Sequence, residues 1–226
     1  MGINKIAVVG ATGNVGREML SILSERKFPC EEVIALASEK SEGDSISFGN
    51  KELVVQSLAS YDFSDTSIAL FSAGGSISEV YAPIAAEQGC IVIDNSSKFR
   101  MDNDVPLIVP EVNIEMLDHY KTTNIIANPN CSTIQMVVAL KPLEDLSSIN
   151  RINVSTYQST SGAGKVAMEE LFNQTKGIFS NQEVEPESFT KQIAFNVIPQ
   201  IGLFLENGNT EEEQKMINET KKIIRP

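Results

Sequence analysis

The glycine-rich segment Gly10–Gly16 limits the possible folds more than any other feature of this sequence. It reads Gly10-Ala11-Thr12-Gly13-Asn14-Val15-Gly16 and follows the apolar run Lys5–Val9, which is typical of a buried strand. The residues after it, from about Val15 to Ser24, place their apolar side chains on one helical face. Glycines at such a junction permit a tight strand-to-helix turn and let main-chain N–H groups approach a pyrophosphate. The spacing is GxxGxxG rather than GxGxxG, and glycines also serve simply to pack a helix on a strand. The position at the start of a β-α-β pattern favours nucleotide binding through Gly10, Gly13 and Gly16.

The rest of the chain continues the alternation of strands and helices. Short apolar runs predict buried strands at 33–37, 68–72, 91–94 and 125–127, with a weaker pair at 46–48 and 53–55. Helices are expected at 76–88, 132–140, 165–173 and 211–224, a half-buried strand at 151–158, a loop at 177–190 and extended chain at 193–201. This order predicts an α/β fold with a parallel sheet and right-handed crossovers. The 226 residues allow one large domain or two small ones, and we place the boundary at residues 128–131, which gives domains 1–130 and 131–226.

Charge and cysteine content exclude several classes of protein. Asp and Glu number 30 against 18 Lys and Arg, a formal net charge of −12, which argues against nucleic acid or an anionic membrane as the main partner. The three cysteines show no CxxC spacing, so neither a disulfide framework nor a metal site is expected. The N-terminal apolar run is too short for a signal peptide or a membrane span. A cytoplasmic protein with reduced thiols is the expectation.

The residues after the second expected strand bear on the choice of nucleotide. An acidic residue at this point usually binds the ribose hydroxyls of NAD, whereas hydroxyls and a cation suit the 2′-phosphate of NADP. Ser38, Lys40 and Ser41 favour NADP, and Glu39 favours NAD. The alternative is that residues 38–41 form a solvated loop with no role in binding. Between the two nucleotides, NADP is modestly preferred.

The segment Asn128–Thr133 places a cysteine where a turn meets the start of a helix. A helix N-terminus stabilises a thiolate, and its free N–H groups can donate to an oxyanion on a bound acyl group. Most cysteines are small buried apolar residues, and Cys30 and Cys90 fit that description. Cys131, flanked by Asn, Pro and Ser, does not, and is a candidate nucleophile.

A second glycine-rich turn, 161–164, follows the expected strand 151–158. Gln158 at the strand end is placed to orient a carbonyl, and the main chain of Ser161 and Gly162 is placed to approach a cofactor. By itself this segment is only a loop. His119, the single histidine, lies in a polar stretch and is expected at the surface rather than in a catalytic role.

Taken together and in order, GATGNVG, LFSAGG, DNSSKFR, VPLIVPEVN, NPNCSTIQ, STYQSTSGAG, AFNVIPQI and ETKKI resemble the bacterial type of the aspartate-β-semialdehyde dehydrogenase family. The resemblance covers essentially the whole chain. The related acetylglutamyl-phosphate reductases rank second, because their cysteine motif is closer to NPGCY.

The resemblance implies a Rossmann-like NADP-binding domain followed by part of an α+β catalytic domain like that of glyceraldehyde-3-phosphate dehydrogenase, through which the family dimerises, here as a homodimer or homotetramer. It implies reductive dephosphorylation of L-aspartyl-4-phosphate by NADPH, giving aspartate semialdehyde and phosphate, on the route to lysine, diaminopimelate, threonine, methionine and isoleucine. Cys131 would form a thioester, Asn130 and Gln158 would position the acyl group, and Glu219 would meet the substrate amino group. Arg100 and Lys222 would hold phosphate. Cofactor contacts are implied for Thr12, Gly13, Asn14, Val15, Ser38, Glu39, Lys40, Ser161 and Gly162.

One part of the family pattern has no counterpart here. The family expects an R-x-P-V-type strand and a catalytic histidine beyond ETKKI, and the sequence ends at Pro226. We therefore expect an N-terminal portion of the enzyme with poor turnover alone, since acid/base help is worth about 10²–10⁴-fold. The alternative from another class is a non-catalytic dinucleotide-binding subunit.

Overall fold

The computed structural model describes residues 3–224 and divides into two compact units. One comprises residues Met1–Asn150 with Lys215–Pro226, and the other comprises Arg151–Gln214. The chain end at Arg225-Pro226, on which the expectation of a partial enzyme rests, lies outside the described residues. The functional boundary at residue 130 falls inside the first unit and stays a prediction.

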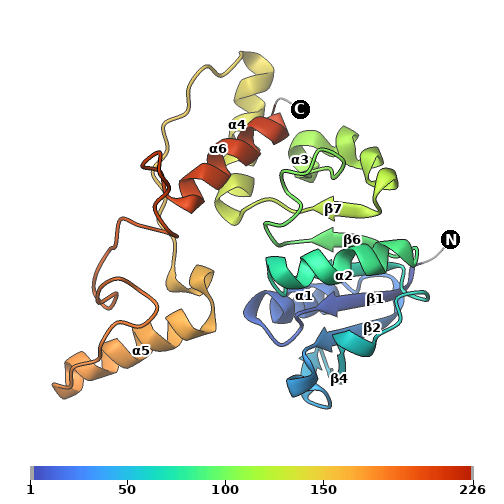
Figure 1. Ribbon diagram of the computed structural model, residues 1–226, viewed down its shortest axis with the longest axis horizontal. Coiled ribbons are helices and arrows are strands. Elements are labelled where there is room, and N and C mark those ends of the chain that lie inside the picture. The colour runs from blue at the N-terminus through green and yellow to red at the C-terminus, as the bar shows by residue number, and fades with distance from the viewer. Residues whose placement is uncertain (1–2, 225–226) are drawn as a thin grey trace. The chain divides into compact units, whose positions relative to one another are not determined.

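The first unit is built on a seven-stranded sheet with the order β3-β4-β2-β1-β5-β6-β7 (Figure 1). Neighbouring strands run parallel except for β3 and β4, which form an antiparallel pair at one edge. The parallel α/β sheet expected from the sequence is confirmed. The strands are β1 (Ile3–Val9), β2 (Cys30–Ala37), β3 (Ser45–Phe48), β4 (Lys51–Ser57), β5 (Ile68–Phe71), β6 (Ile91–Asp94) and β7 (Ile125–Ala127).

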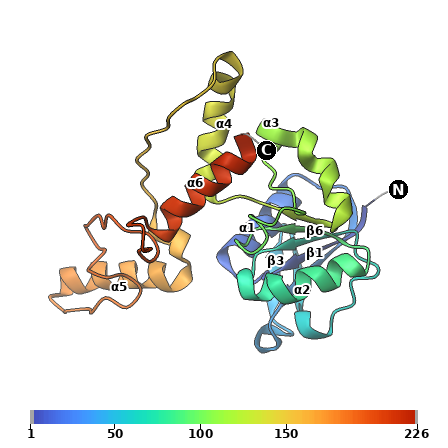
Figure 2. The same ribbon diagram turned by 45° about the horizontal axis from the view of Figure 1, so that its top comes forward.

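Side chains alternate between two apolar layers, one on each face of this sheet. Val8 of β1 packs with Leu20 of α1 (Asn14–Glu25), whereas Ala7 and Val9 pack with Ala82 of α2 (Gly75–Glu87). The two helices therefore cover opposite faces, and Figure 2 shows α2 in front of the strands. Burial on both faces explains why the strands read as continuous apolar runs.

Shorter helices and the long α4 complete the first unit, and α6 enters it from the second. No helix within residues 3–224 is long and apolar enough to span a membrane. These elements are η1 (Glu39–Ser41), η2 (Leu58–Ser60), α3 (Pro110–Asn113), η3 (Ile114–Thr122), α4 (Cys131–Leu146) and α6 (Glu211–Ile224).

The second unit contains η4 (Thr160–Ala163) and α5 (Lys165–Ser180). Buried polar side chains of α5 hold the loop that follows. Gln174 accepts main-chain hydrogen bonds from Ile193 (2.8 Å) and Ala194 (3.1 Å), and its amide donates to Glu170 (2.9 Å).

Two sequence expectations for this unit are wrong. Residues 151–158 are not a strand and are mostly exposed, because no segment within residues 3–224 pairs with them and a strand needs a neighbour to satisfy its main-chain groups. Helix α5 continues to Ser180, so the polar segment expected to start at residue 177 begins later. Its end is fixed by Asn181, which takes the left-handed conformation (φ 52°) that closes many helices.

Candidate active site

The glycine turn Gly10–Gly16 lies at the carboxyl end of β1, at the centre of the sheet. Val9 is opposite Leu36 of β2 and Phe71 of β5, so the three turns that follow these strands meet at one edge. Strand order reverses between β1 and β5, which is where ligands bind in open α/β sheets. Helix α1 begins at Asn14, directly after this turn, and a helix N-terminus at this place is what a pyrophosphate site requires.

Two of the three glycines have no room for a side chain. Gly10 has a φ of +84°, and a Cβ there would lie 2.9 Å from the main-chain nitrogen of Ala73 in the β5–α2 turn. A Cβ at Gly16 would overlap the carbonyl group of Gly10. Gly13 differs, because its Cβ would meet only the Gly10 oxygen, at 3.4 Å.

Because Gly16 has no room for a Cβ and Gly13 has, we expect alanine at the two positions to affect stability differently. Gly16→Ala should lower the free energy of unfolding by about 2 kcal/mol, because two backbone segments must move apart. Gly13→Ala is the matched control in the same turn and should leave the free energy of unfolding nearly unchanged. Urea titration followed by circular dichroism measures both, and equal losses would contradict the steric explanation.

The residues expected to select the nucleotide follow β2 directly. Ser38, Glu39 and Lys40 are exposed, and Ser41 is half-buried in η1. Because β2 is adjacent to β1, this segment lies beside the glycine turn. Both the hydroxyls and the two opposite charges remain accessible to a ligand.

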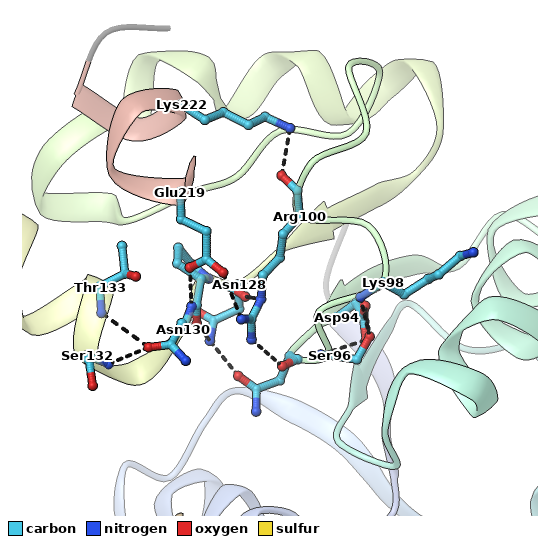
Figure 3. Close-up of polar contacts among 12 residues, drawn as sticks. Asp94, Ser96, Lys98, Arg100, Asn128, Asn130, Ser132, Thr133, Glu219 and Lys222 are labelled. Carbon is cyan, nitrogen blue, oxygen red and sulfur yellow. Dashed lines mark hydrogen bonds and ion pairs between the residues drawn. The ribbon is translucent and has the colours of Figure 1, made fainter. Parts of the chain in front are cut away.

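Cys131 is the first residue of α4 and is exposed. Asn130 precedes it as the N-cap, and its side-chain oxygen accepts hydrogen bonds from the main-chain N–H groups of Ser132 (2.9 Å) and Thr133 (3.4 Å) (Figure 3). The thiol therefore lies at the positive end of a 16-residue helix whose start is fixed. This is the environment in which cysteines act as nucleophiles.

The other two thiols are poorly placed for chemistry. Burial raises the pKa of the Cys90 thiol to about 12, and burial also raises the pKa of the half-buried Cys30 thiol.

We therefore predict that iodoacetamide modifies Cys131 at least about 100-fold faster than Cys90 at pH 7.5. A thiol with a pKa of about 12 is ionised in roughly one molecule in 30,000 at that pH, and only the thiolate reacts. Peptide mass spectrometry after timed labelling measures the two rates separately. Similar rates in the folded protein would remove the argument for a reactive Cys131.

Arg100 and Glu219 form a buried ion pair beside the cysteine turn. Arg100 Nη1 lies 2.9 Å from Glu219 Oε1, and the two side chains are 9% and 2% exposed. The other groups of the guanidinium donate to the main-chain oxygens of Asn128 and Asn95, each at 2.9 Å. Glu219 also accepts a hydrogen bond from the main-chain N–H of Asn130 (2.7 Å). Three residues far apart in sequence thus meet at the start of α4 (Figure 3).

Lys222, about one turn after Glu219 in α6, binds the main chain at and after Arg100. Its ammonium group donates to the main-chain oxygens of Arg100 (2.9 Å), Asp102 (2.7 Å) and Val105 (2.9 Å). Burial lowers the pKa of Lys222, a shift that the nearby Asp102 carboxylate opposes. In this structure Lys222 therefore holds the chain after Arg100 in place.

Asp94 is a site residue that the sequence reasoning missed. It ends β6, is fully buried, and accepts hydrogen bonds from the hydroxyls of Ser78 in α2 and Ser96, both at 2.6 Å. It therefore joins the start of α2 to the loop that carries Arg100. The available signal was an acidic residue at the end of an otherwise apolar strand.

The remaining candidates lie in the second unit or on the surface. Gln158 packs against the turn at Gly162, where a Cβ would overlap its side-chain amide. Ser161 lies in η4 in the same turn. His119 is exposed in η3, so the expectation of a surface histidine is confirmed.

A Rossmann-type sheet with a glycine turn at its switch point, followed by a cysteine at a helix start, is the arrangement typical of nicotinamide-dependent dehydrogenases that use a cysteine nucleophile. Two family models match the chain: the semialdehyde dehydrogenase NAD-binding domain over residues 5–120 and the semialdehyde dehydrogenase dimerisation domain over residues 140–226. The chain belongs to the semialdehyde dehydrogenase family.

Individual relatives agree with this assignment. Aspartate-semialdehyde dehydrogenase 2 of Vibrio cholerae is 56% identical over 97% of this chain, and the enzyme of Rickettsia conorii is 54% identical over the same share. The chain spans 65% of the length of these curated relatives. A crystal structure of Vibrio cholerae aspartate semialdehyde dehydrogenase II complexed with ASA superposes with a TM-score of 0.96 at 54% identity, covering 99% of this chain and 67% of that one. The Candida albicans enzyme, solved with NADP, gives a TM-score of 0.71 at 26% identity, covering 98% and 60%.

Proposed function

We propose that the protein acts as an aspartate-semialdehyde dehydrogenase, converting L-aspartyl-4-phosphate to aspartate semialdehyde and phosphate. The observation that carries this proposal is the exposed Cys131 at the capped start of α4, in a chain of this family. Its thiolate attacks the acyl carbon, and the carbon–oxygen bond to phosphate breaks to give a thioester and inorganic phosphate. The bound nicotinamide supplies a hydride to the thioester carbon. The carbon–sulfur bond then breaks, releasing the aldehyde and regenerating the thiolate.

Asn130 and Gln158 are the residues we propose to position the acyl group, as the family resemblance implies. Asn130 already fixes the main chain on both sides of Cys131 through its hydrogen bonds. We assign no proton-transfer role to His119, which is exposed in η3. We also propose that residues 1–130 bind the cofactor, that residues 131–226 contribute to catalysis, and that the protein assembles as a homodimer or homotetramer. The match to a dimerisation domain supports assembly.

For Arg100, Lys222 and Glu219 the resemblance implies direct contacts with substrate: phosphate for the two cations and the amino group for the carboxylate. The structure shows Arg100 and Glu219 bound to each other and Lys222 bound to three main-chain oxygens. Substrate contact would therefore compete with these interactions. The direct roles stay predictions.

We propose NADP as the cofactor, held at the glycine turn by residues 10–16 and at the adenosine end by residues 38–41, with further contacts from Ser161 and Gly162 as the family resemblance implies. The tight packing of Gly10 and Gly16 fits a close approach of main chain to pyrophosphate. Lys40 and the hydroxyls of Ser38 and Ser41 are accessible for a 2′-phosphate. The Candida albicans relative solved with NADP is consistent with this assignment.

Lys40→Ala should raise the KM for NADP about tenfold and leave the KM for NAD unchanged, because it removes one charge-assisted hydrogen bond to an exposed phosphate. Lys51→Ala, another exposed lysine of the same unit, is the control. Initial rates with each cofactor measure the effect. An equal change for both cofactors would place Lys40 outside the 2′-phosphate site.

The function itself is tested with the protein expressed from its complete gene. Purified protein should reduce NADP when given aspartate semialdehyde and inorganic phosphate, and the rate should depend on both. N-acetylglutamate semialdehyde should be a poor substrate. Preference for the acetylated compound would support the reductase alternative, and binding of NADP without turnover of either compound would support a non-catalytic protein.

A further inference from the structure

The buried pair of Arg100 and Glu219 connects helix α6 to Asn130, the residue next to the proposed nucleophile. Glu219 belongs to α6, whereas Asn130 caps α4, and the two lie 89 positions apart in sequence. One carboxylate oxygen of Glu219 faces Arg100 and the other faces the main-chain N–H of Asn130. Both carboxylate oxygens of Glu219 therefore have a hydrogen-bonding partner, and the side chain is 2% exposed.

Asn130 is held at its main chain and at its side chain by different partners. Its N–H donates to Glu219, while its side-chain oxygen accepts hydrogen bonds from the N–H groups of Ser132 and Thr133 in the first turn of α4. Rotation of the cap would disrupt these contacts together. Cys131 lies between the two ends of this arrangement, so its main chain has little freedom.

Arg100 fixes the other boundary of the same turn. It donates to the main-chain oxygen of Asn128 and to that of Asn95, and the side chains of these two asparagines are joined by a hydrogen bond of 2.6 Å. Residues 128 and 130 are thus anchored by the two members of one ion pair.

We infer that Glu219, supported by Arg100, is a positioning residue that orients the Cys131 thiol at the start of α4 through the main-chain N–H of Asn130. This inference rests on the proposed function, in which Cys131 is the nucleophile. It differs from the substrate contact implied by the family resemblance, because it acts in the protein without any ligand.

Two double variants separate the hydrogen-bond acceptor from the charge. Arg100→Met with Glu219→Gln keeps an oxygen that can accept from the Asn130 N–H, whereas Arg100→Met with Glu219→Leu removes it. Both remove one positive and one negative charge, so the net charge near the thiol stays the same. Glu87→Gln, at the exposed end of α2, controls for replacement of a carboxylate elsewhere.

Cys131 alkylation by iodoacetamide is measured without substrate or cofactor at pH 7, with circular dichroism to show that each variant is folded. The leucine variant should react about threefold more slowly than the glutamine variant at pH 7, because the thiolate loses its fixed place at the helix end. The Glu87→Gln variant should match the unaltered protein.

Equal alkylation of the two double variants at pH 7 would overturn the inference. If their activity were nevertheless lost, Glu219 would be a substrate-binding residue, and if the unaltered protein had no activity at all, the proposed function alone would fail. Should the leucine variant not fold, amide hydrogen exchange of the unaltered protein decides. The Asn130 amide should exchange at least about 100-fold more slowly than in an unfolded chain, and exchange at the unfolded rate would overturn the inference.

Discussion

Replacing Cys131 by serine is expected to lower the rate of phosphate-dependent NADP reduction at least about 10⁴-fold in the protein expressed from its complete gene. The serine hydroxyl remains protonated at neutral pH and is a far weaker nucleophile than a thiolate at a helix start. The change is small in volume, and the exposed position of residue 131 leaves the core untouched. The kcat measured at saturating aspartate semialdehyde and phosphate reports this loss directly.

Cys30→Ser is the matched control for this experiment. Cys30 is half-buried at the start of β2, and burial raises the pKa of its thiol, so it has no expected part in the chemistry. Its variant should keep at least about half of the activity. A Cys131→Ser variant that retained more than about a tenth of the activity would show that the thioester route is wrong.

The sheet could be predicted because its strands are buried on both faces and therefore read as short apolar runs. The run at residues 91–94 matches β6 and the run at 125–127 matches β7. The helix at 211–224 also has the predicted bounds, since Thr210 and Glu213 satisfy each other's main-chain N–H groups at its start. These signals are local, and local signals are what a single sequence contains.

The contacts that organise the cysteine turn are not local. Arg100 and Glu219 are 119 residues apart, and nothing in either segment indicates that they pair. The alternating pattern at residues 151–158 was a misleading local signal, because alternation describes a surface that suits a strand but supplies no neighbour for it. The start of α4 was placed one residue late, and that one residue puts Cys131 inside the first helical turn.

Glu219→Leu alone is expected to lower the free energy of unfolding by about 3–5 kcal/mol, the largest loss of stability that we predict for a single substitution. Removing one member of a buried pair leaves the other charge without compensation, and Arg100 is only 9% exposed on its side chain. The main-chain N–H of Asn130 loses Glu219 as an acceptor at the same time. Urea unfolding followed by circular dichroism measures the loss.

The double variant Arg100→Met with Glu219→Leu should lose less than about 2 kcal/mol, because it replaces both charges by apolar groups of similar size and leaves no isolated ion in the interior. Asp118→Asn breaks the exposed pair with Lys121 and should cause no measurable change, since solvent screens that pair. The difference in free energy of unfolding between the single and the double variant distinguishes two explanations. If the single variant is less stable than the double variant, the cost comes from the uncompensated charge of Arg100. If the two lose the same amount, the carboxylate stabilises the fold mainly through the Asn130 turn, and the ion pair contributes little of its own.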